Sequence, residues 1–394
     1  MNTTASAERV HIGFFGRSNV GKSSLINAVT GQELSVVAEA RGTTTDPVLK
    51  AMELLPLGPV VLFDTPGLDD DTALGALRVR RARQMLNRAD IAVLVLDATA
   101  GYTPADAELL SFIRAKGIPC VVAVNKSEMA TPEIPLEGAT VVRVSAKTGL
   151  GLTELKETLA RSAPTDDGRR LVADLLAPGD CVVLVTPIDA AAPKGRLILP
   201  QVQTLRDILD SGAYAVVAKE TELAAALTRL ATPPKLVITD SQAFRQVAQI
   251  VPREIPLTSF SILFSRYKGY LAGAVKGAAA LEGLKTGDKV LISEGCTHHR
   301  QCGDIGTVKL PKLIKRLCGQ EPQFDFSSGN GFPEDLSSYA AVVHCGGCML
   351  TEREVRFRAK CAADQGIPFT NYGIAIAHAN GILARALEPL KGCF

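Results

Sequence analysis

Five side chains in the last third of the chain have the types and spacing of a metal site. A Cys-x-His pair, Cys296 and His298, is followed after 45 intervening residues by His-Cys-x-x-Cys, formed by His344, Cys345 and Cys348. Each half comes at the end of an apolar run, "KVLISEG" or "AAVVH", that predicts a buried strand. Because the carboxyl ends of neighbouring parallel strands meet at one edge of a sheet, we expect the two halves to surround one metal centre.

Thiolate and imidazole ligands suit either zinc or an iron–sulfur cluster. A structural zinc ion usually lies between two compact chelating pairs on small loops. These ligands instead follow apolar strands of a substantial α/β domain, which has a core without any metal. Three firm Cys ligands and one exchangeable position would let an iron accept another molecule, so the pattern favours an iron–sulfur cluster. The fourth position is left open between His298, His344 and an oxygen ligand such as Asp304.

A phosphate-binding pattern lies near the start of the chain. "GRSNVGKS", Gly16 to Ser23, follows an apolar strand and opens a helix, so its backbone amides can surround phosphate oxygens. Lys22 would reach the β and γ phosphates, and the Ser23 hydroxyl would bind Mg²⁺. "DTPG" offers the Asp64 carboxylate to Mg²⁺ and the Gly67 amide to the γ phosphate. The two motifs together predict a nucleotide-hydrolysing site.

The nucleotide base is read by two later motifs, "NKSE" at residues 125–128 and "SAK" at residues 145–147. A carboxylate accepts two hydrogen bonds from guanine that adenine cannot supply, so GTP is favoured over ATP. The motifs resemble those of the translation-factor-like GTPases, with Glu128 where that group usually has Asp. The predicted nucleotide contacts are Gly16, Asn19, Val20, Gly21, Lys22, Ser23, Ser24, Thr44, Asp64, Asn125, Lys126, Glu128, Ser145, Ala146 and Lys147.

The segment "RGTTTDP" resembles the switch of the tRNA-modifying and ribosome-assembly GTPases. That resemblance implies that Thr44 senses Mg²⁺ and the γ phosphate, and that Asn19 coordinates K⁺. Leu68 follows "DTPG" where the small signalling GTPases have a water-orienting Gln. Because an apolar side chain cannot align a nucleophile, we expect slow GTP hydrolysis that depends on potassium, self-association or a partner.

The order of strand and helix patterns predicts an α/β fold in three domains. Apolar strands alternate with helical patterns up to residue 162, which predicts a GTPase domain with a mostly parallel sheet at residues 1–165. A second α/β series is expected at residues 166–264 and a third, with the cysteines, at residues 265–394. One long helix is expected over residues 264–284. The basic runs "KLPKLIKR" and "REVRFRAK" are interpreted as solvated helix faces.

The composition narrows the class of partner and the compartment. Lys and Arg (43) nearly cancel Asp and Glu (41), which does not support phosphate-driven nucleic-acid binding. The first ten residues contain no apolar segment typical of a signal peptide, and no later stretch has 18 uninterrupted apolar residues, so we expect a cytoplasmic protein without membrane contact. In a reducing compartment, nine cysteines favour metal or redox roles over disulfides.

Taken together, these features resemble the GTPase and scaffold protein of iron–iron (FeFe) hydrogenase maturation. The resemblance covers essentially the whole chain and includes the segment from Cys296 to Pro311. It implies that the middle domain forms a homodimer, possibly part of a higher oligomer, and that Cys296, Cys345 and Cys348 bind a 4Fe–4S cluster. It also implies that the protein receives a two-iron precursor made with two radical-SAM maturases and delivers it to apo-hydrogenase.

Two other classes of function remain open on the sequence. The first is a ribosome- or tRNA-associated GTPase with a structural zinc site. The second is a GTP-switched protein-interaction module with no cargo, in which the cysteines are dispensable for activity.

Overall fold

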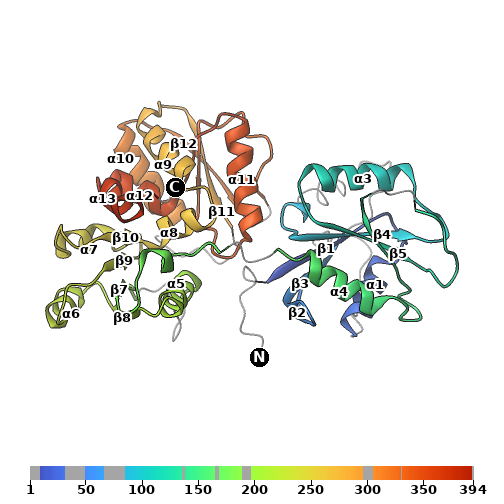
Figure 1. Ribbon diagram of the computed structural model, residues 1–394. Helices are drawn as coiled ribbons and strands as arrows, with labels where there is room; N and C mark the ends of the chain where they lie inside the picture. Colours follow the sequence, from blue (N-terminus) through green and yellow to red (C-terminus); the bar gives the residue numbers. More distant parts are fainter. Residues whose placement is uncertain are drawn as a thin grey trace. The chain divides into compact units, whose positions relative to one another are not determined.

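The structure is a computed structural model that describes residues 9–31, 49–65, 85–134, 138–164, 168–188, 197–295, 305–329 and 331–392. It forms two compact units, Met1–Asp166 and Asp167–Phe394 (Figure 1). Several predicted features lie outside the described residues: Thr44, Gly67, Leu68, Cys296, His298, Asp304 and the boundary after residue 165.

The first unit contains a six-stranded sheet in the order β2-β3-β1-β4-β5-β6. Its strands are β1 (Val10–Phe15), β2 (Leu49–Leu54), β3 (Gly58–Asp64), β4 (Ile91–Asp97), β5 (Cys120–Asn125) and β6 (Thr140–Arg143). Only the edge strand β2 pairs antiparallel, with β3, while the other described pairings are parallel. The predicted mostly parallel sheet is confirmed.

Helices cover both faces of this sheet, since its central strands are apolar on both sides. The helices are α1 (Lys22–Thr30), α3 (Pro104–Ala115) and α4 (Leu152–Ser162). Leu25 of α1 and Leu155 of α4 pack in one core, whereas Leu110 of α3 packs in a second core. Figure 1 shows α3 on the face of the sheet opposite α1 and α4. This sandwich fixes the ends of β1, β3, β5 and β6, from which the nucleotide motifs extend.

The second unit contains two four-stranded sheets, both parallel. The first has the order β10-β9-β7-β8, with β7 (Cys181–Val185), β8 (Tyr214–Ala218), β9 (Leu236–Thr239) and β10 (Leu257–Ser259). The second has the order β12-β11-β13-β14, with β11 (Lys289–Glu294), β12 (Gln323–Ser328), β13 (Ala341–His344) and β14 (Phe369–Asn371). With the GTPase sheet, they give the predicted three-part α/β layout.

The helices of this unit are short, and one stretch is more broken than the sequence predicts. They are α5 (Leu199–Asp210), α6 (Leu223–Arg229), α7 (Phe244–Ile250), α8 (Phe260–Tyr267), α9 (Leu271–Ala280), α10 (Leu310–Cys318), α11 (Glu352–Asp364), α12 (Tyr372–Ala379) and α13 (Leu383–Leu387). The single helix expected over residues 264–284 is wrong, because the chain turns at Gly269, where φ is 75°. The predicted boundary after residue 264 falls within α8.

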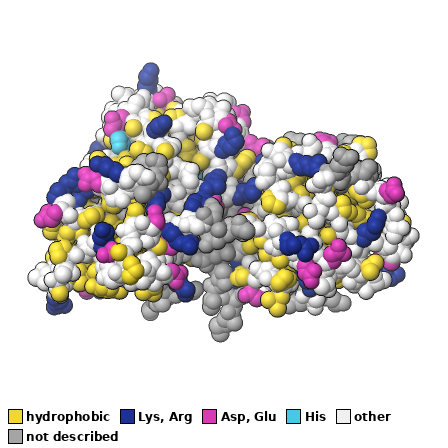
Figure 2. Space-filling model, viewed as in Figure 1, with side chains coloured by type: hydrophobic (Ala, Val, Ile, Leu, Met, Phe, Trp, Pro, Cys, Tyr) yellow, Lys and Arg dark blue, Asp and Glu magenta, His cyan; other side chains and the backbone are white. Residues whose placement is uncertain are grey.

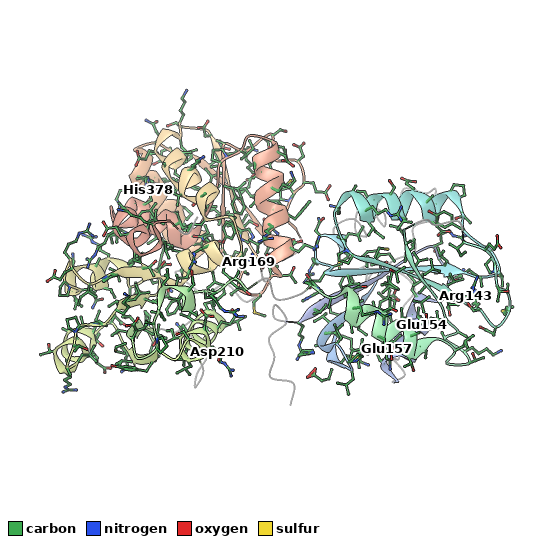
Figure 3. The ribbon with its side chains drawn as sticks, viewed as in Figure 1. Arg143, Glu154, Glu157, Arg169, Asp210 and His378 are labelled. Carbon is green, nitrogen blue, oxygen red and sulfur yellow. The ribbon has the colours of Figure 1, made fainter. Side chains whose placement is uncertain are left out.

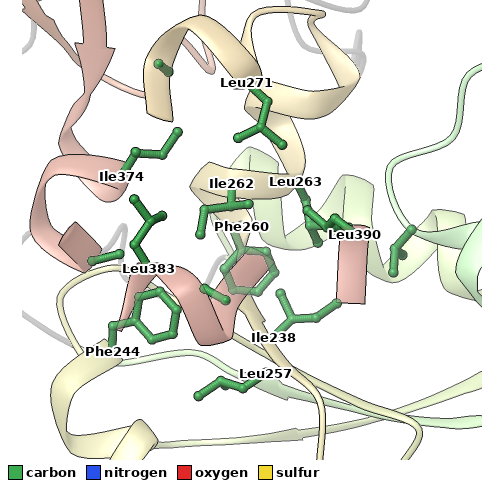
Figure 4. Close-up of a cluster of buried hydrophobic side chains, with 14 of the residues drawn as sticks. Ile238, Phe244, Leu257, Phe260, Ile262, Leu263, Leu271, Ile374, Leu383 and Leu390 are labelled. Carbon is green, nitrogen blue, oxygen red and sulfur yellow. The ribbon is translucent and has the colours of Figure 1, made fainter. Parts of the chain in front are cut away.

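The two sheets of the second unit share one hydrophobic core. Ile238 and Leu257 from the first sheet, together with Phe244, pack in the same buried cluster as Ile374 and Leu383 near the C-terminus (Figure 4). Phe260 and Ile262 of α8 lie between these groups in Figure 4. The middle and last sequence segments therefore fold as one compact body. None of the helices in the described part of the chain is long and apolar enough to cross a membrane.

Candidate functional site

The phosphate-binding loop between β1 and α1 depends on two glycines. Gly16 has a φ of 147°, and a Cβ there would lie 2.4 Å from the carbonyl oxygen of Val95. Gly21 has a φ of 89°, and a Cβ there would lie 2.4 Å from Nδ2 of Asn125. Larger side chains are disfavoured at both positions by conformation and by space. The loop therefore lies directly against β4 and the end of β5.

The catalytic side chains predicted in the described part of the site lie close together. Lys22 is buried, and its Nζ donates to the carbonyls of Gly16 (3.1 Å) and Arg17 (2.8 Å). Ser23 Oγ donates a hydrogen bond to Oδ2 of Asp64, at the end of β3. The other carboxylate oxygen, Oδ1, is buried and has no hydrogen-bond partner among the described residues. Burial raises the pKa of Asp64 above its usual range. A hydroxyl beside a carboxylate with an unsatisfied oxygen fits a Mg²⁺ ion, which would restore the charge balance.

The base-reading motifs are joined to the phosphate loop by hydrogen bonds. Asn125 Nδ2 donates to the carbonyl of Val20 (3.0 Å), and Asn125 Oδ1 accepts from the backbone amide of Ala146 (3.0 Å). Lys126 Nζ donates to the carbonyl of Asn19 (3.1 Å) and pairs with Asp97 (2.5 Å). Asn125 thus connects three predicted motifs that are far apart in the sequence.

The residues expected at the guanine differ in their exposure. Glu128 is exposed, and a hydrogen bond with Ser145 holds the pKa of its carboxyl below the usual range. Ser145 is fully buried, whereas Lys147 is exposed. Ser24 is exposed in the first turn of α1. A carboxylate that stays ionised at the surface of the site is the group that guanine recognition needs.

The cysteine motif comes at the end of two paired strands, as the sequence predicts. β11 and β13 are parallel neighbours, with Ser293 opposite His344. The thiol of Cys345, directly after β13, accepts hydrogen bonds from the amides of Gly295 (3.0 Å) and Gly347 (3.4 Å). Burial raises the pKa of the Cys345 thiol, while these two amides act in the opposite direction. Amide donors to sulfur fit a metal-bound thiolate, because they stabilise its negative charge.

His344 is engaged at both ring nitrogens. Nδ1 lies 2.6 Å from the carbonyl oxygen of Cys345, which can only accept, so Nδ1 carries the proton. Nε2 therefore accepts from Nη1 of Arg358 at 3.1 Å. Burial and then the Arg358 charge lower the pKa of His344 to about 3, which keeps the imidazole neutral. To bind a metal, His344 would have to give up one of these hydrogen bonds.

Two buried cations lie beside the cysteine loop, and sequence reasoning missed both. Arg358 on α11 is 1% exposed and pairs with Glu354 (2.8 Å), so the interpretation of "REVRFRAK" as a solvated face is wrong at this residue. Lys268, at the end of α8, donates to the carbonyls of Gly347 and Leu350. Burial lowers the pKa of Lys268 to about 8. For Arg358, the available sequence signal was its i,i+4 spacing from Glu354, which is typical of an ion pair on a helix.

The start of α11 is also held by the chain segment that begins the second unit. Arg169, labelled in Figure 3, pairs with Glu352 at 2.7 Å and donates to the carbonyl of Tyr267 at 2.8 Å. Arg356 contacts the same Glu352 oxygen at 2.8 Å. Within the described residues, no three His, Cys, Asp or Glu side chains gather as a metal site. Cys296 and His298 belong to the segment 296–304, which is not described.

Comparisons with known families divide the chain into three matched segments. Residues 11–126 match the 50S ribosome-binding GTPase family, residues 171–269 the Hydrogen maturase F dimerization domain, and residues 272–389 the Hydrogen maturase F tetramerization domain.

Similar curated proteins match part of the chain. The tRNA modification GTPase MnmE of Synechococcus sp. (strain JA-2-3B'a(2-13)) is 39% identical over 166 residues, which cover 39% of this chain and 36% of that protein. MnmE of Laribacter hongkongensis is 32% identical over 202 residues, covering 46% and 44%. The chain thus spans less than half the length of these curated relatives.

Among solved structures, the G domain of the T. maritima FeoB iron transporter is 27% identical and covers 39% of this chain and 98% of that one, with a TM-score of 0.31. The dimerization and tetramerization models of one family account for most of the chain beyond the GTPase domain. The protein carries a GTPase domain and belongs to the hydrogen maturase F family.

Proposed function

We propose that this protein is a GTP-hydrolysing scaffold in FeFe-hydrogenase maturation that binds a 4Fe–4S cluster and delivers a two-iron precursor to apo-hydrogenase. The observation that carries the proposal is the Cys345 thiol, held by the Gly295 and Gly347 amides where β11 and β13 end together. This arrangement occurs in a chain with a GTPase domain and two hydrogen maturase F domains.

For GTP hydrolysis, each side chain has a distinct role. Lys22 would neutralise charge on the β and γ phosphates, while Ser23 and Asp64 would hold Mg²⁺. Thr44 and Gly67 complete the contacts to the γ phosphate. Mg²⁺ would supply charge stabilisation of the transferring phosphoryl group. The buried Oδ1 of Asp64 supports this assignment, because a carboxylate oxygen with no hydrogen-bond partner in the described part of the chain requires compensation.

Guanine selection and potassium binding are assigned to two other residues of the site, Glu128 and Asn19. Glu128 would accept the guanine hydrogen bonds, with Asn125 and Lys126 bracing the phosphate loop behind it. Asn19 adopts a left-handed φ of 62°, and its carbonyl is already used by Lys126. We therefore assign K⁺ binding to the Asn19 side chain.

For the cluster, Cys345, Cys348 and Cys296 are the proposed ligands. Cys296 follows Gly295 directly in the chain, and the Gly295 amide contacts the Cys345 thiol. A bound cluster would supply an iron with one exchangeable position for the precursor. Because both nitrogens of His344 are hydrogen-bonded, it would have to give up one of these bonds to be a fixed fourth ligand. His298 and an oxygen ligand such as Asp304 are the other candidates.

The family's dimerization segment, residues 171–269, has an edge suited to a second copy of the chain. β8 is the last strand in its sheet among the described residues, and Tyr214 and Val217 on it are exposed large apolar side chains. An edge strand with exposed apolar residues favours strand pairing across a homodimer. On the face shown in Figure 2, Lys and Arg are interspersed with Asp and Glu, which favours protein partners over nucleic acid.

Anaerobic purification followed by metal analysis tests the proposal against its main alternative. A brown protein with iron and acid-labile sulfide supports the scaffold, and activation of apo-hydrogenase by the precursor-loaded protein supports delivery. A colourless protein that holds zinc would instead support a ribosome- or tRNA-associated GTPase with a structural zinc site.

A further inference from the structure

Lys268 is a buried cation whose ammonium reaches into the cysteine loop. It follows α8 and is 5% exposed. Its Nζ donates to the carbonyl oxygens of Gly347 at 2.6 Å and Leu350 at 3.2 Å, 79 and 82 residues further along the chain. These two carbonyls flank Cys348 on either side. The ammonium therefore fixes the path of the loop between the two cysteines and α11.

The backbone on both sides of this contact is also held. Nε of Arg356 donates to the carbonyl of Lys268 at 2.9 Å, which ties the end of α8 to α11. Gly347 has a φ of 63°, and a Cβ there would lie 2.8 Å from Val355. Contacts therefore hold both the end of α8 that carries Lys268 and the turn at Gly347 to which its ammonium donates. These contacts and its burial define the position of the Lys268 side chain.

The charge of Lys268 is not paired directly with an acid among the described residues. No carboxylate of these residues lies within ion-pair distance of its Nζ, and its two acceptors are neutral carbonyls. Glu352 acts on the ammonium electrostatically from a longer distance, but its carboxylate is already shared by Arg169 and Arg356. Burying a cation without a counter-charge is costly. The groups that could carry the missing negative charge are the neighbouring thiols of Cys345 and Cys348, which are anionic when they bind a metal.

We propose that Lys268 is a positioning residue of the metal site, which sets the Cys345–Cys348 loop and balances the charge of its metal-bound thiolates. This inference rests on the proposed function, since it presumes that the cysteines bind a cluster. Lys268 lies in the segment matched by the dimerization domain, whereas both cysteines lie in the tetramerization segment. The metal site is thus completed by a side chain from the neighbouring family segment.

The test compares Lys268→Met, Lys268→Gln and Lys268→Arg with the exposed control Lys276→Met on α9. Each full-length variant is reconstituted anaerobically with iron and sulfide. Three quantities are measured: the melting temperature of the apo-protein, the rate of cluster loss to an iron chelator, and the midpoint potential of the cluster. Met removes charge and donors, Gln keeps donors without charge, and Arg keeps the charge.

We expect the Met variant to lose its cluster about 10- to 100-fold faster than the wild type, the range for lost partners of metal ligands. Because reduction adds negative charge that an ammonium stabilises, Met and Gln should shift the midpoint potential to more negative values. Arg and the Lys276 control should keep the wild-type potential. A purely structural lysine would change the melting temperature without moving the potential.

The Gln variant decides the question if the Met variant does not fold, since it retains hydrogen-bond donors at the same place. Wild-type release rate and potential in the Gln variant would overturn the inference while leaving the proposed function intact. A wild-type protein that takes up no iron would overturn both.

Discussion

The phosphate-binding loop and the cysteine site are built in opposite ways. The phosphate-binding loop depends on backbone conformation within a few consecutive residues, with Gly16, Asn19 and Gly21 all at positive φ. The cysteine site depends on buried side chains from distant segments, because Lys268 and Arg358 hold the loop that carries Cys345 and Cys348. The difference teaches that a local motif can specify the first site, whereas the second requires the whole second unit to be folded.

Breaking the buried charge pair of the second unit should have the largest effect on stability. Arg358→Met leaves the Glu354 carboxylate buried without its partner, and we expect a loss of about 3–5 kcal/mol in the free energy of unfolding. Urea unfolding of the apo-protein measures this loss. The control Lys360→Met removes an exposed i,i+4 pair with Asp364 and should cost less than about 0.5 kcal/mol. Similar losses in the two variants would argue against a site held by buried charge.

Breaking the nucleotide site should leave the cysteine site intact. Lys22→Ala removes the cation closest to the phosphates, and we expect kcat/KM for GTP to fall about 10²- to 10³-fold. Iron content after anaerobic reconstitution should equal that of the wild type, because the two sites lie in different compact units. Parallel loss of iron would show that the two sites depend on each other.

Substitutions at two glycines can separate the cost of the left-handed backbone from the contact that Gly21 makes in the nucleotide site. Gly31 has a φ of 63°, and no heavy atom of the described residues lies within 4 Å of a Cβ built there. Gly31→Ala should therefore cost only the left-handed conformation, about 1–2 kcal/mol in the free energy of unfolding. Gly21→Ala adds a clash with Asn125 and should weaken GTP affinity by ~10-fold, or about 1.4 kcal/mol, beyond the control. Calorimetric titration with GTP gives both affinities. Equal affinities would remove the special role of the Gly21–Asn125 contact.

The smallest expected effect concerns the monovalent cation. We predict that GTP is hydrolysed in preference to ATP, and faster in potassium than in sodium at matched ionic strength, with Asn19→Ala abolishing the difference between the salts. Steady-state phosphate release provides the rates. Identical rates in the two salts for the wild type would exclude potassium from the site.

The sequence predicted the parts of the fold with strong local signals. Continuous apolar strands such as β4 and β5 were found, and so was the pairing that brings residues 293 and 344 together. The edge strands β2 ("LKAMEL") and β12 ("QFDFSS") were missed, because their polar, partly exposed sequences lack that signal.

Long-range packing explains the remaining differences. The shared core of the second unit and the roles of Lys268 and Arg358 arise from contacts between distant segments, which no local spacing encodes. The turn at Gly269 interrupts an Ala- and Gly-rich stretch that the sequence analysis interpreted as one helix. Thr44, Gly67, Cys296 and His298 stay predictions, since the structure does not describe them.

The central claim is that three cysteines hold a 4Fe–4S cluster in a GTPase. Anaerobic reconstitution of single Ala variants at Cys296, Cys345, Cys348, His298 and His344 tests it most directly, with Cys361→Ala as the control. Iron, sulfide and the paramagnetic signal of the reduced cluster are measured in each. We predict loss of the cluster in the three ligand variants, partial retention in either His variant, and wild-type values in the control, because thiolates form the strongest protein bonds to iron. Full occupancy in any of the three Cys variants would contradict the claim, and complete loss in a His variant would contradict an exchangeable fourth position.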